Sequence, residues 1–399
     1  MLKAIEVKPD VYWVGGVDWN ERSFHGYTTE RGSTYNAYLI MDEKIALVDT
    51  CKAAFADDLL ARVADVVDPA RIDYIVSNHG EPDHSGALPK VAAAAPNAKV
   101  VTGDPKGAAI LRAYYGDGLD LMPVKTGDGL ELGCRTLSFV QTPMVHWPDN
   151  MVAYDAYDRI LFSNDAFGQH LATSKRFDDE AGLPEVLLQA RKYYANIVMP
   201  YGRQVRKALD ALRGLDLDLI APSHGVIWRS HIADALAAYD RWSADAPEDQ
   251  AVVAYDSMWH TTEAMAQAIA EGFVESGVPV RLCDLKCNHI SDIMADVLEA
   301  KYLAVGSPTL NSGMMPTVAQ FLCYLKGLAP RNRVGIAFGS YGWAPAGPNE
   351  VQAALEAAKL ELPLEPLTRQ WADDEEALQA VRDAVIDLVE DQGDVREVA

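Results

Sequence analysis

The chain has 399 residues, 49% of them hydrophobic and 23% charged, and a formal net charge of −23 at pH 7. This length favours two domains, and the negative charge argues against nucleic acid or an anionic membrane as a partner. No apolar run could span a bilayer and the N-terminus lacks a signal-peptide segment, so we expect a cytoplasmic protein. The five cysteines contain no Cys-x-x-Cys pair, which excludes a zinc ribbon, a rubredoxin-type iron site and a disulfide framework.

The first half of the chain predicts short strands and turns, at residues 11–14, 35–40 and 44–49, with a helix at about 53–67. A buried strand at residues 74–76 leads into the run His79-Gly-Glu-Pro-Asp-His84. Gly80 and Pro82 should keep this run from continuing as a helix or a strand. Four groups able to bind a metal within six residues favour a metal site over a polar loop with two incidental histidines.

Three further predicted strands end just before a candidate metal ligand. They cover residues 137–141, 159–163 and 219–222. Taken alone, a histidine in such a position is more often a core residue than a ligand. Because the carboxyl ends of strands meet at one edge of an open sheet, however, we expect the groups to converge. The converging set is His79, Glu81, Asp83, His84, His146, Asp165 and His224.

Strand ends that carry His-x-Glu-x-Asp-His, then His, then Asp, then His resemble the metallo-β-lactamase-like αββα sandwich, whose members bind two metals. The hydrolases of that superfamily have a second histidine where this chain has Glu81. An oxygen-rich ligand set suits iron better than zinc, so the resemblance implies a scaffold used for redox chemistry. It further implies that His79, Glu81 and His146 bind one iron, that Asp83, His84 and His224 bind the other, and that Asp165 lies between them. His84 either binds its iron directly or lies just outside the ligand set.

Four other polar residues could donate a proton or a hydrogen bond to bound substrate, since metal sites depend on their surroundings. They are His25, Tyr27, His170 and Tyr194. For each of them, a structural role explains the residue about as well as a catalytic role. We include His25, Tyr27 and Tyr194 as expected catalytic residues.

A short polar run broken by Pro247 follows a predicted helix at residues 232–242 and indicates a domain boundary. We predict a metallo-β-lactamase-like domain over residues 1–248 and a second domain over residues 249–399. Strands and helices then alternate, as in a doubly wound parallel sheet. The strands are expected at residues 251–255, 278–282, 302–305, 333–338 and 362–364, with helices including 262–274 and 374–390.

The loops after three of these strands indicate a flavin site rather than simple tight turns. The first is rich in hydroxyls at the start of a helix, an arrangement that binds anions, and it contains no Lys or Arg. The absence of Gly-x-Gly-x-x-Gly argues against a dinucleotide-binding domain. The pattern resembles flavodoxin and implies FMN. The residues expected to bind it are Ser257, Met258, Trp259, Thr261, Thr262, Pro308, Thr309, Leu310, Asn311, Ser340, Tyr341, Gly342 and Trp343.

A di-iron β-lactamase-like domain followed by a flavodoxin-like domain resembles the flavodiiron proteins, also called A-type flavoproteins. The resemblance covers essentially the whole chain and implies four-electron reduction of O₂ to water or two-electron reduction of two NO to N₂O. It also implies electrons from a separate rubredoxin or similar small protein, a head-to-tail homodimer (possibly a dimer of dimers), and a form without fused rubredoxin or flavin reductase. We slightly favour O₂ as substrate.

Two alternatives remain at this point. The first is a zinc hydrolase with a flavodoxin appendage, and Glu81 and the flavin loops count against it. The second is an electron carrier or redox sensor with a vestigial metal site, and the complete ligand set counts against that.

Overall fold

The computed structural model describes residues 2–372 and 374–397, with side chains described up to residue 392. The chain divides into two compact units. One comprises the residues up to Tyr193 together with Tyr201–Ser243, and the other comprises Tyr194–Pro200 with the residues from Ala244 onward. The predicted domain boundary between residues 248 and 249 stays a prediction. No helix within the described residues is long and apolar enough to cross a membrane.

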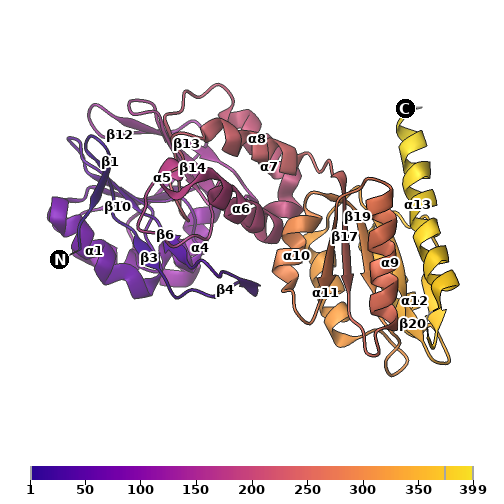
Figure 1. Cartoon of the computed structure of the whole chain (residues 1–399). Helices are drawn as coiled ribbons and strands as arrows, with labels where there is room; N and C mark the ends of the chain where they lie inside the picture. Colours follow the sequence, from indigo (N-terminus) through magenta and orange to yellow (C-terminus); the bar gives the residue numbers. More distant parts are fainter. Residues whose placement is uncertain (1, 373, 398–399) are drawn as a thin grey trace. The chain divides into compact units, whose positions relative to one another are not determined.

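The first unit is a sandwich of two packed sheets with helices on its outer faces (Figure 1). In pairing order, one sheet consists of β1 (Ile5–Lys8), β2 (Val11–Trp13), β7 (Tyr38–Ile40), β8 (Ala46–Val48), β9 (Tyr74–Ser77), β10 (Lys99–Gly103) and β11 (Leu121–Val124). The other consists of β12 (Gly129–Glu131), β13 (Thr136–Gln141), β14 (Met151–Asp155), β15 (Ile160–Asn164) and β16 (Leu219–Pro222). Small pairs are formed by β3 (Gly16–Asp18) with β6 (Ser33–Tyr35) and by β4 (Ser23–Phe24) with β5 (Tyr27–Thr28).

Side-chain alternation explains which face of each sheet is buried. Along β13, Leu137 and Phe139 are buried while Thr136 and Ser138 are exposed, as expected for a strand with a period of two. The buried residues of both sheets form one hydrophobic cluster, so the core lies between the sheets. The helices of this unit are α1 (Ala56–Val66), α2 (Pro82–Ser85), α3 (Leu88–Ala94), α4 (Lys106–Tyr115), α5 (Asp178–Ala181), α6 (Leu183–Tyr193), α7 (Gly202–Leu212) and α8 (Ile232–Ser243).

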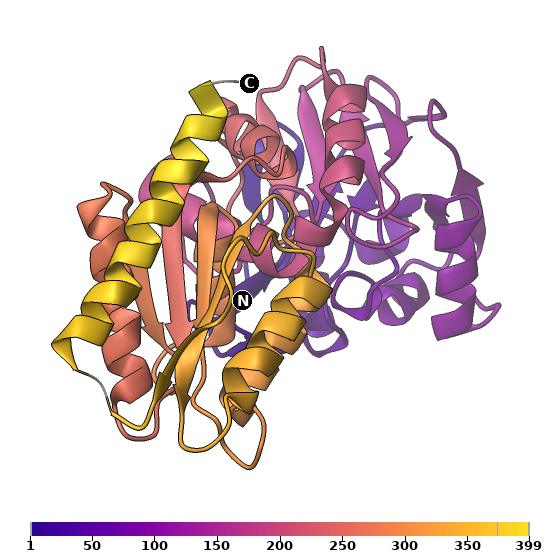
Figure 2. The ribbon, with the colours of Figure 1, turned by 90° about the vertical axis from the view of Figure 1, so that its right-hand side faces the viewer.

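The second unit is a parallel sheet with helices on both faces. In pairing order its strands are β18 (Val280–Asp284), β17 (Glu248–Tyr255), β19 (Ala300–Gly306), β20 (Val334–Tyr341) and β21 (Leu367–Gln370). Its helices are α9 (Thr261–Glu275), α10 (Ile290–Val297), α11 (Pro316–Leu328), α12 (Ala346–Ala357) and α13 (Glu375–Glu397). Residues of α9 and α13 join one buried cluster, and residues of α10, α11 and α12 join the other. Figure 2 shows α13 (yellow) and α12 (orange) on opposite sides of the strands. This strand order, with the first strand between the second and third, is that of flavodoxin-like sheets.

Three local predictions need correction. The fifth strand of the parallel sheet is β21, not residues 362–364, because Leu362 and Leu364 pack against the core from a loop. The run after His79 contains the one-turn helix α2, and Pro82 begins it because a first helical position needs no N–H donor. Strand β17 starts at Glu248, inside the predicted linker.

Candidate metal centre and flavin pocket

The predicted metal ligands come from both sheets of the sandwich. His79, Glu81, Asp83 and His84 follow β9 of the first sheet, the last two lying on α2. His146, Asp165 and His224 follow β13, β15 and β16 of the second sheet. Strands β15 and β16 are parallel neighbours, so the loops that follow them start at the same sheet edge. All of these side chains are buried.

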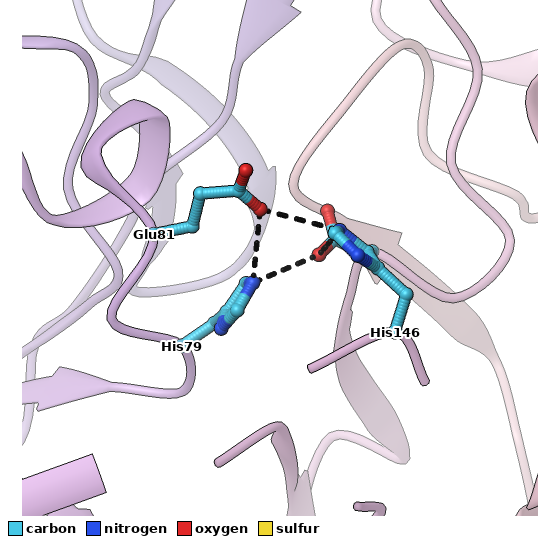
Figure 3. Close-up of side chains that lie close together, drawn as sticks. His79, Glu81 and His146 are labelled. Carbon is cyan, nitrogen blue, oxygen red and sulfur yellow. Dashed lines mark hydrogen bonds and ion pairs between the residues drawn. The ribbon is translucent and has the colours of Figure 1, made fainter. Parts of the chain in front are cut away.

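One group of ligands surrounds a shared point between Glu81 and Asp165. Oε2 of Glu81 lies 3.2 Å from Nε2 of His79 and 3.2 Å from Nε2 of His146. Oδ2 of Asp165 lies 3.6 Å and 3.3 Å from the same two nitrogens. Figure 3 shows His79 and Glu81, from one loop, pointing toward His146, which comes from another segment. One atom from each of the four residues therefore fits around a single ion.

A second group of ligands lies on the other side of Asp165. Oδ2 of Asp83 is 3.3 Å from Nε2 of His84 and 3.1 Å from Nε2 of His224. Oδ1 of Asp165 lies 3.0 Å and 3.6 Å from those nitrogens. The two oxygens of Asp165 thus face different groups of ligands, as a carboxylate that bridges two metals would. His84 lies close enough to Asp83 and His224 to share an ion with them, and its direct binding of iron stays a prediction.

Buried polar atoms without partners show that cations fit this site. Within the described residues, both carboxylate oxygens of Asp83 and Oδ2 of Asp165 make no hydrogen bond of acceptable geometry. Their nearest nitrogens lie only 3.1–3.6 Å away. Buried carboxylates without donors are costly, and an ion between oxygen and nitrogen would satisfy both.

The electrostatics of these side chains lead to the same conclusion. Burial alone would lower the pKa values of His79 and His146, but the surrounding carboxylates raise both to about 10. The pKa of His84 is raised to about 9 against the effect of burial, by Asp83 and Asp165. The carboxylates therefore favour positive charge at this site, and metal ions would supply it.

Two further groups fix the orientation of ligand imidazoles, and sequence analysis missed both. Asp149 accepts from Nδ1 of His79, with both carboxylate oxygens at 3.2 Å, and Gly80 donates its N–H to Asp149 at 2.7 Å. Nδ1 of His224 donates to the carbonyl of Thr34 at 2.7 Å, which leaves Nε2 facing Asp83. The only available signal was that Asp149 follows His146 closely in the chain.

The predicted surrounding residues His25, Tyr27 and His170 lie near these ligands. His25 occupies the turn between β4 and β5, with Nε2 2.9 Å from Oε1 of Glu81 and 46% of its side chain exposed. Tyr27 is buried with its ring 5.5 Å from that of His170. Nδ1 of His170 lies 2.7 Å from Oγ of Ser33, and burial holds the pKa of His170 well below its usual value, so the ring is neutral.

The two adjacent tyrosines at the end of α6 have different surroundings. Tyr193 is buried and donates its hydroxyl to Oδ1 of Asp165 at 3.0 Å. Tyr194, the predicted residue, is buried in the π-helical segment Tyr194–Val198, which groups with the second unit. A catalytic role for Tyr194 stays a prediction, and Tyr193 is the contact that sequence analysis missed. The doubled tyrosine gave no way to choose between them.

A cavity of about 250 Å³ lies at the carboxyl ends of the strands in the parallel sheet. It includes the place where the strand order reverses between β17 and β19, the usual ligand position in such folds. Nine of the predicted flavin residues line it: Met258, Trp259, Thr261, Pro308, Thr309, Ser340, Tyr341, Gly342 and Trp343. Ala344 and Trp371 also line it. Trp371 was not predicted, because the strand before it, β21, was predicted at the wrong residues.

The other predicted flavin residues lie around this cavity rather than in its wall. Thr262 shares a hydrogen bond of 2.9 Å with Ser340, and Leu310 makes a tight backbone pair with Gly313 beside Asn311. Oγ of Ser257 is buried and, within the described part of the chain, has no hydrogen-bond partner. A phosphate at the N-terminus of α9 would provide one, so the loop fits a flavin mononucleotide.

These features define a class of protein: a paired metal centre on an αββα sandwich, joined to a flavodoxin-like domain. The model of the ODP family beta lactamase matches residues 34–225, and that of flavodoxin matches residues 253–384. The chain is 43% identical to a nitric oxide reductase of Moorella thermoacetica, covering 95% of this chain and 96% of the relative. It is 41% identical to a rubredoxin-oxygen oxidoreductase of Megalodesulfovibrio gigas, covering 92% of each.

Solved structures give the same result. The rubredoxin oxygen:oxidoreductase from Desulfovibrio gigas superimposes with a TM-score of 0.93 at 39% identity, over 96% of this chain and 97% of that one. The flavodiiron protein from Giardia intestinalis gives 0.93 at 36% identity, over 97% and 96%. This chain belongs to the flavodiiron family. Its cofactors are accordingly FMN and a pair of non-haem irons.

Proposed function

We propose that this protein reduces O₂ to water, NO to N₂O, or both, at a di-iron centre supplied with electrons through FMN. The observation that supports the proposal is that the two carboxylate oxygens of Asp165 face two separate groups of buried ligands. His79, Glu81 and His146 would hold one iron. Asp83, His84 and His224 would hold the other.

When bound, the irons supply the electrons and the binding positions for gas reduction, and FMN supplies one or two electrons at a time. The chain's own residues orient the ligands and supply protons. Reduction of O₂ consumes four protons with four electrons, and reduction of two NO consumes two with two. His25 is suited to deliver them because it is half-exposed and its Nε2 lies 2.9 Å from Glu81. Tyr27 and Tyr194 remain proposed as further donors.

Consumption of each gas tests the function. Purified protein with measured iron and FMN content is supplied with reduced rubredoxin, and O₂ and NO are followed with electrodes in separate runs. Turnover of either gas supports the proposal, and we expect O₂ to be the better substrate. An Asp165→Ala variant that keeps its flavin should lose this turnover. Unchanged turnover in that variant would favour an electron carrier with an unused metal site.

The donor and the assembly are part of the same proposal. We expect a rubredoxin or a similar small protein as donor, in keeping with the name of the Megalodesulfovibrio relative. The iron ligands and the flavin loops belong to different units, and electron transfer between cofactors requires them to approach closely. A head-to-tail homodimer, alone or as a dimer of dimers, would bring the FMN of one copy beside the irons of the other. A monomer in solution with full turnover would contradict this arrangement.

Metal analysis separates this function from zinc-dependent hydrolysis. Glu81 and Asp165 supply oxygen to the first group, where a zinc site would be expected to use more nitrogen or sulfur. Protein produced with ample iron should therefore contain about two irons and be yellow from FMN. A colourless zinc protein would exclude the proposal.

A further inference from the structure

An apolar pocket opens on the outer face of the first unit, among β15, α7 and α8, and neither cofactor site includes it. Its volume is about 360 Å³. Arg213 and Asp240 are the charged residues in its lining. The remainder is dominated by leucines, namely Leu161, Leu209, Leu212, Leu215, Leu217 and Leu236.

A second, smaller cavity continues from this pocket toward the metal centre. Leu209 and Leu212 line both spaces, so they form the partition between them. The inner cavity has a volume of about 10 Å³, roughly the least that holds one water molecule, so it is a narrow passage rather than a resting place for a guest. Its far wall includes Val145 and Ala166. These two residues are the immediate chain neighbours of the metal ligands His146 and Asp165.

The polar groups described in the wall of the inner cavity already make hydrogen bonds within the protein. The hydroxyl of Thr142 bonds to Asn150 at 2.8 Å, and that of Tyr239 accepts the N–H of Phe167 at 2.7 Å. The carbonyl of Ala166 accepts from Ser163 at 2.7 Å, and the carbonyl of Phe167 accepts from two side chains. Apolar cavities large enough for a guest bind apolar molecules such as xenon, and of the two spaces the outer pocket has that size.

We infer that the outer leucine pocket holds the diatomic gas substrate and that the inner cavity passes it to the metal centre past Val145 and Ala166. The inference rests on the proposed function, because O₂ and NO are small, nearly apolar molecules. They gain dispersion contacts in such cavities and lose few hydrogen bonds on leaving water. Leu209 and Leu212 act as the gate between the two spaces.

Xenon provides a test that does not depend on turnover. Crystals of the full-length protein pressurised with xenon should show the atom in the outer pocket. In Leu209→Trp the indole should occupy the outer pocket, which has room for it, and xenon should be lost from the pocket. An empty outer pocket in the unsubstituted protein would overturn the inference.

Steady-state kinetics test whether the gas reaches the metal centre through these cavities. In Leu209→Trp the KM for the gas should rise at least about tenfold while kcat at saturating gas stays unchanged, because access slows and chemistry does not. Leu209→Ala, which widens the gate, should leave KM unchanged or lower it. Leu188→Trp, at an exposed leucine of α6, is the matched control and should behave as the unsubstituted protein. Leu209→Phe replaces the tryptophan variant if the latter loses iron or FMN.

The results separate this inference from the proposed function. If the unsubstituted protein consumes neither gas while xenon still binds, the proposed function fails and the outer pocket stands as an apolar binding site. If gas is consumed and both Leu209 variants keep the unsubstituted KM, delivery through these cavities is refuted although the function holds.

Discussion

Replacing Asp149 should weaken iron binding although Asp149 is not itself a ligand. Its carboxylate holds Nδ1 of His79 with both oxygens at 3.2 Å and accepts the N–H of Gly80 at 2.7 Å. Losing such a partner typically costs 10- to 100-fold in metal affinity, about 1.4–2.7 kcal/mol. Asp149→Ala also leaves the Gly80 N–H buried and unpaired, which costs about 1–3 kcal/mol of folding stability. Asp149→Asn can keep that bond while losing an acceptor for His79.

The assay for Asp149 is competition for ferrous iron between the protein and a chelator, with FMN content and thermal unfolding measured alongside. The alanine variant should lose both affinity and stability, and the asparagine variant mainly affinity. Asp155→Asn is the matched control, because Asp155 is equally buried but pairs with Leu137 at the opposite end of β13 and β14 from the site. It should change stability and leave iron affinity alone. Iron affinity within about twofold of the unsubstituted value in Asp149→Ala would refute the reasoning, given the range expected for such partners.

Glu81→His should shift the metal content from iron toward zinc, because it exchanges an oxygen ligand for nitrogen. Elemental analysis of protein produced with both metals measures the ratio of iron to zinc, and an unchanged ratio would contradict the prediction. Trp371→Ala should weaken FMN binding by about 5- to 150-fold, which is the contribution of one aromatic stacking contact. A titration followed by flavin fluorescence measures this, and the control Trp19→Ala, at an exposed site of the first unit, should leave FMN binding unchanged. Asp256 is buried and its pKa is lowered: burial opposes this, but hydrogen bonds from Lys286 and Thr317 outweigh it. Asp256→Asn should therefore reduce the free energy of unfolding above pH 3.8, and this loss of stability should shrink as the pH falls through the lowered pKa of Asp256 in the folded state. Urea unfolding of both proteins from pH 7 to pH 3 measures the loss, and a loss that does not change with pH would contradict the prediction.

The predicted metal ligands lie together in the structure because their positions follow from strand ends. Once 74–76, 137–141, 159–163 and 219–222 are taken as strands of packed sheets, their following loops must meet at one edge. Asp149 and Thr34 could not be found in this way. Each acts through a hydrogen bond to the far side of an imidazole, and that contact depends on side-chain orientation rather than on strand position.

The errors in the second unit have a common physical cause. Leu362 and Leu364 alternate as strand residues do, but they fill space beside the core from a loop. The true strand β21 lies at an edge of the sheet and has only partly buried and exposed residues. Its polar residues Arg369 and Gln370 interrupt the apolar pattern that predicts a buried strand. Trp371 was lost with it. Edge strands are short and polar because an exposed hydrophobic edge invites aggregation, so this kind of omission is expected.

The location of the ligands links metal binding to the packing of the sandwich. Residues that follow β9 belong to one sheet and residues that follow β13, β15 and β16 belong to the other, so each group of ligands draws on both sheets. Any ion that binds here holds the two sheets together at that edge. Because it binds the folded sandwich far better than the unfolded chain, it also adds to folding stability by mass action. Without metal, three carboxylates and four imidazoles share the same buried space and depend on protons for balance. The same residues that prepare the site for redox chemistry therefore make the sandwich depend on its metals.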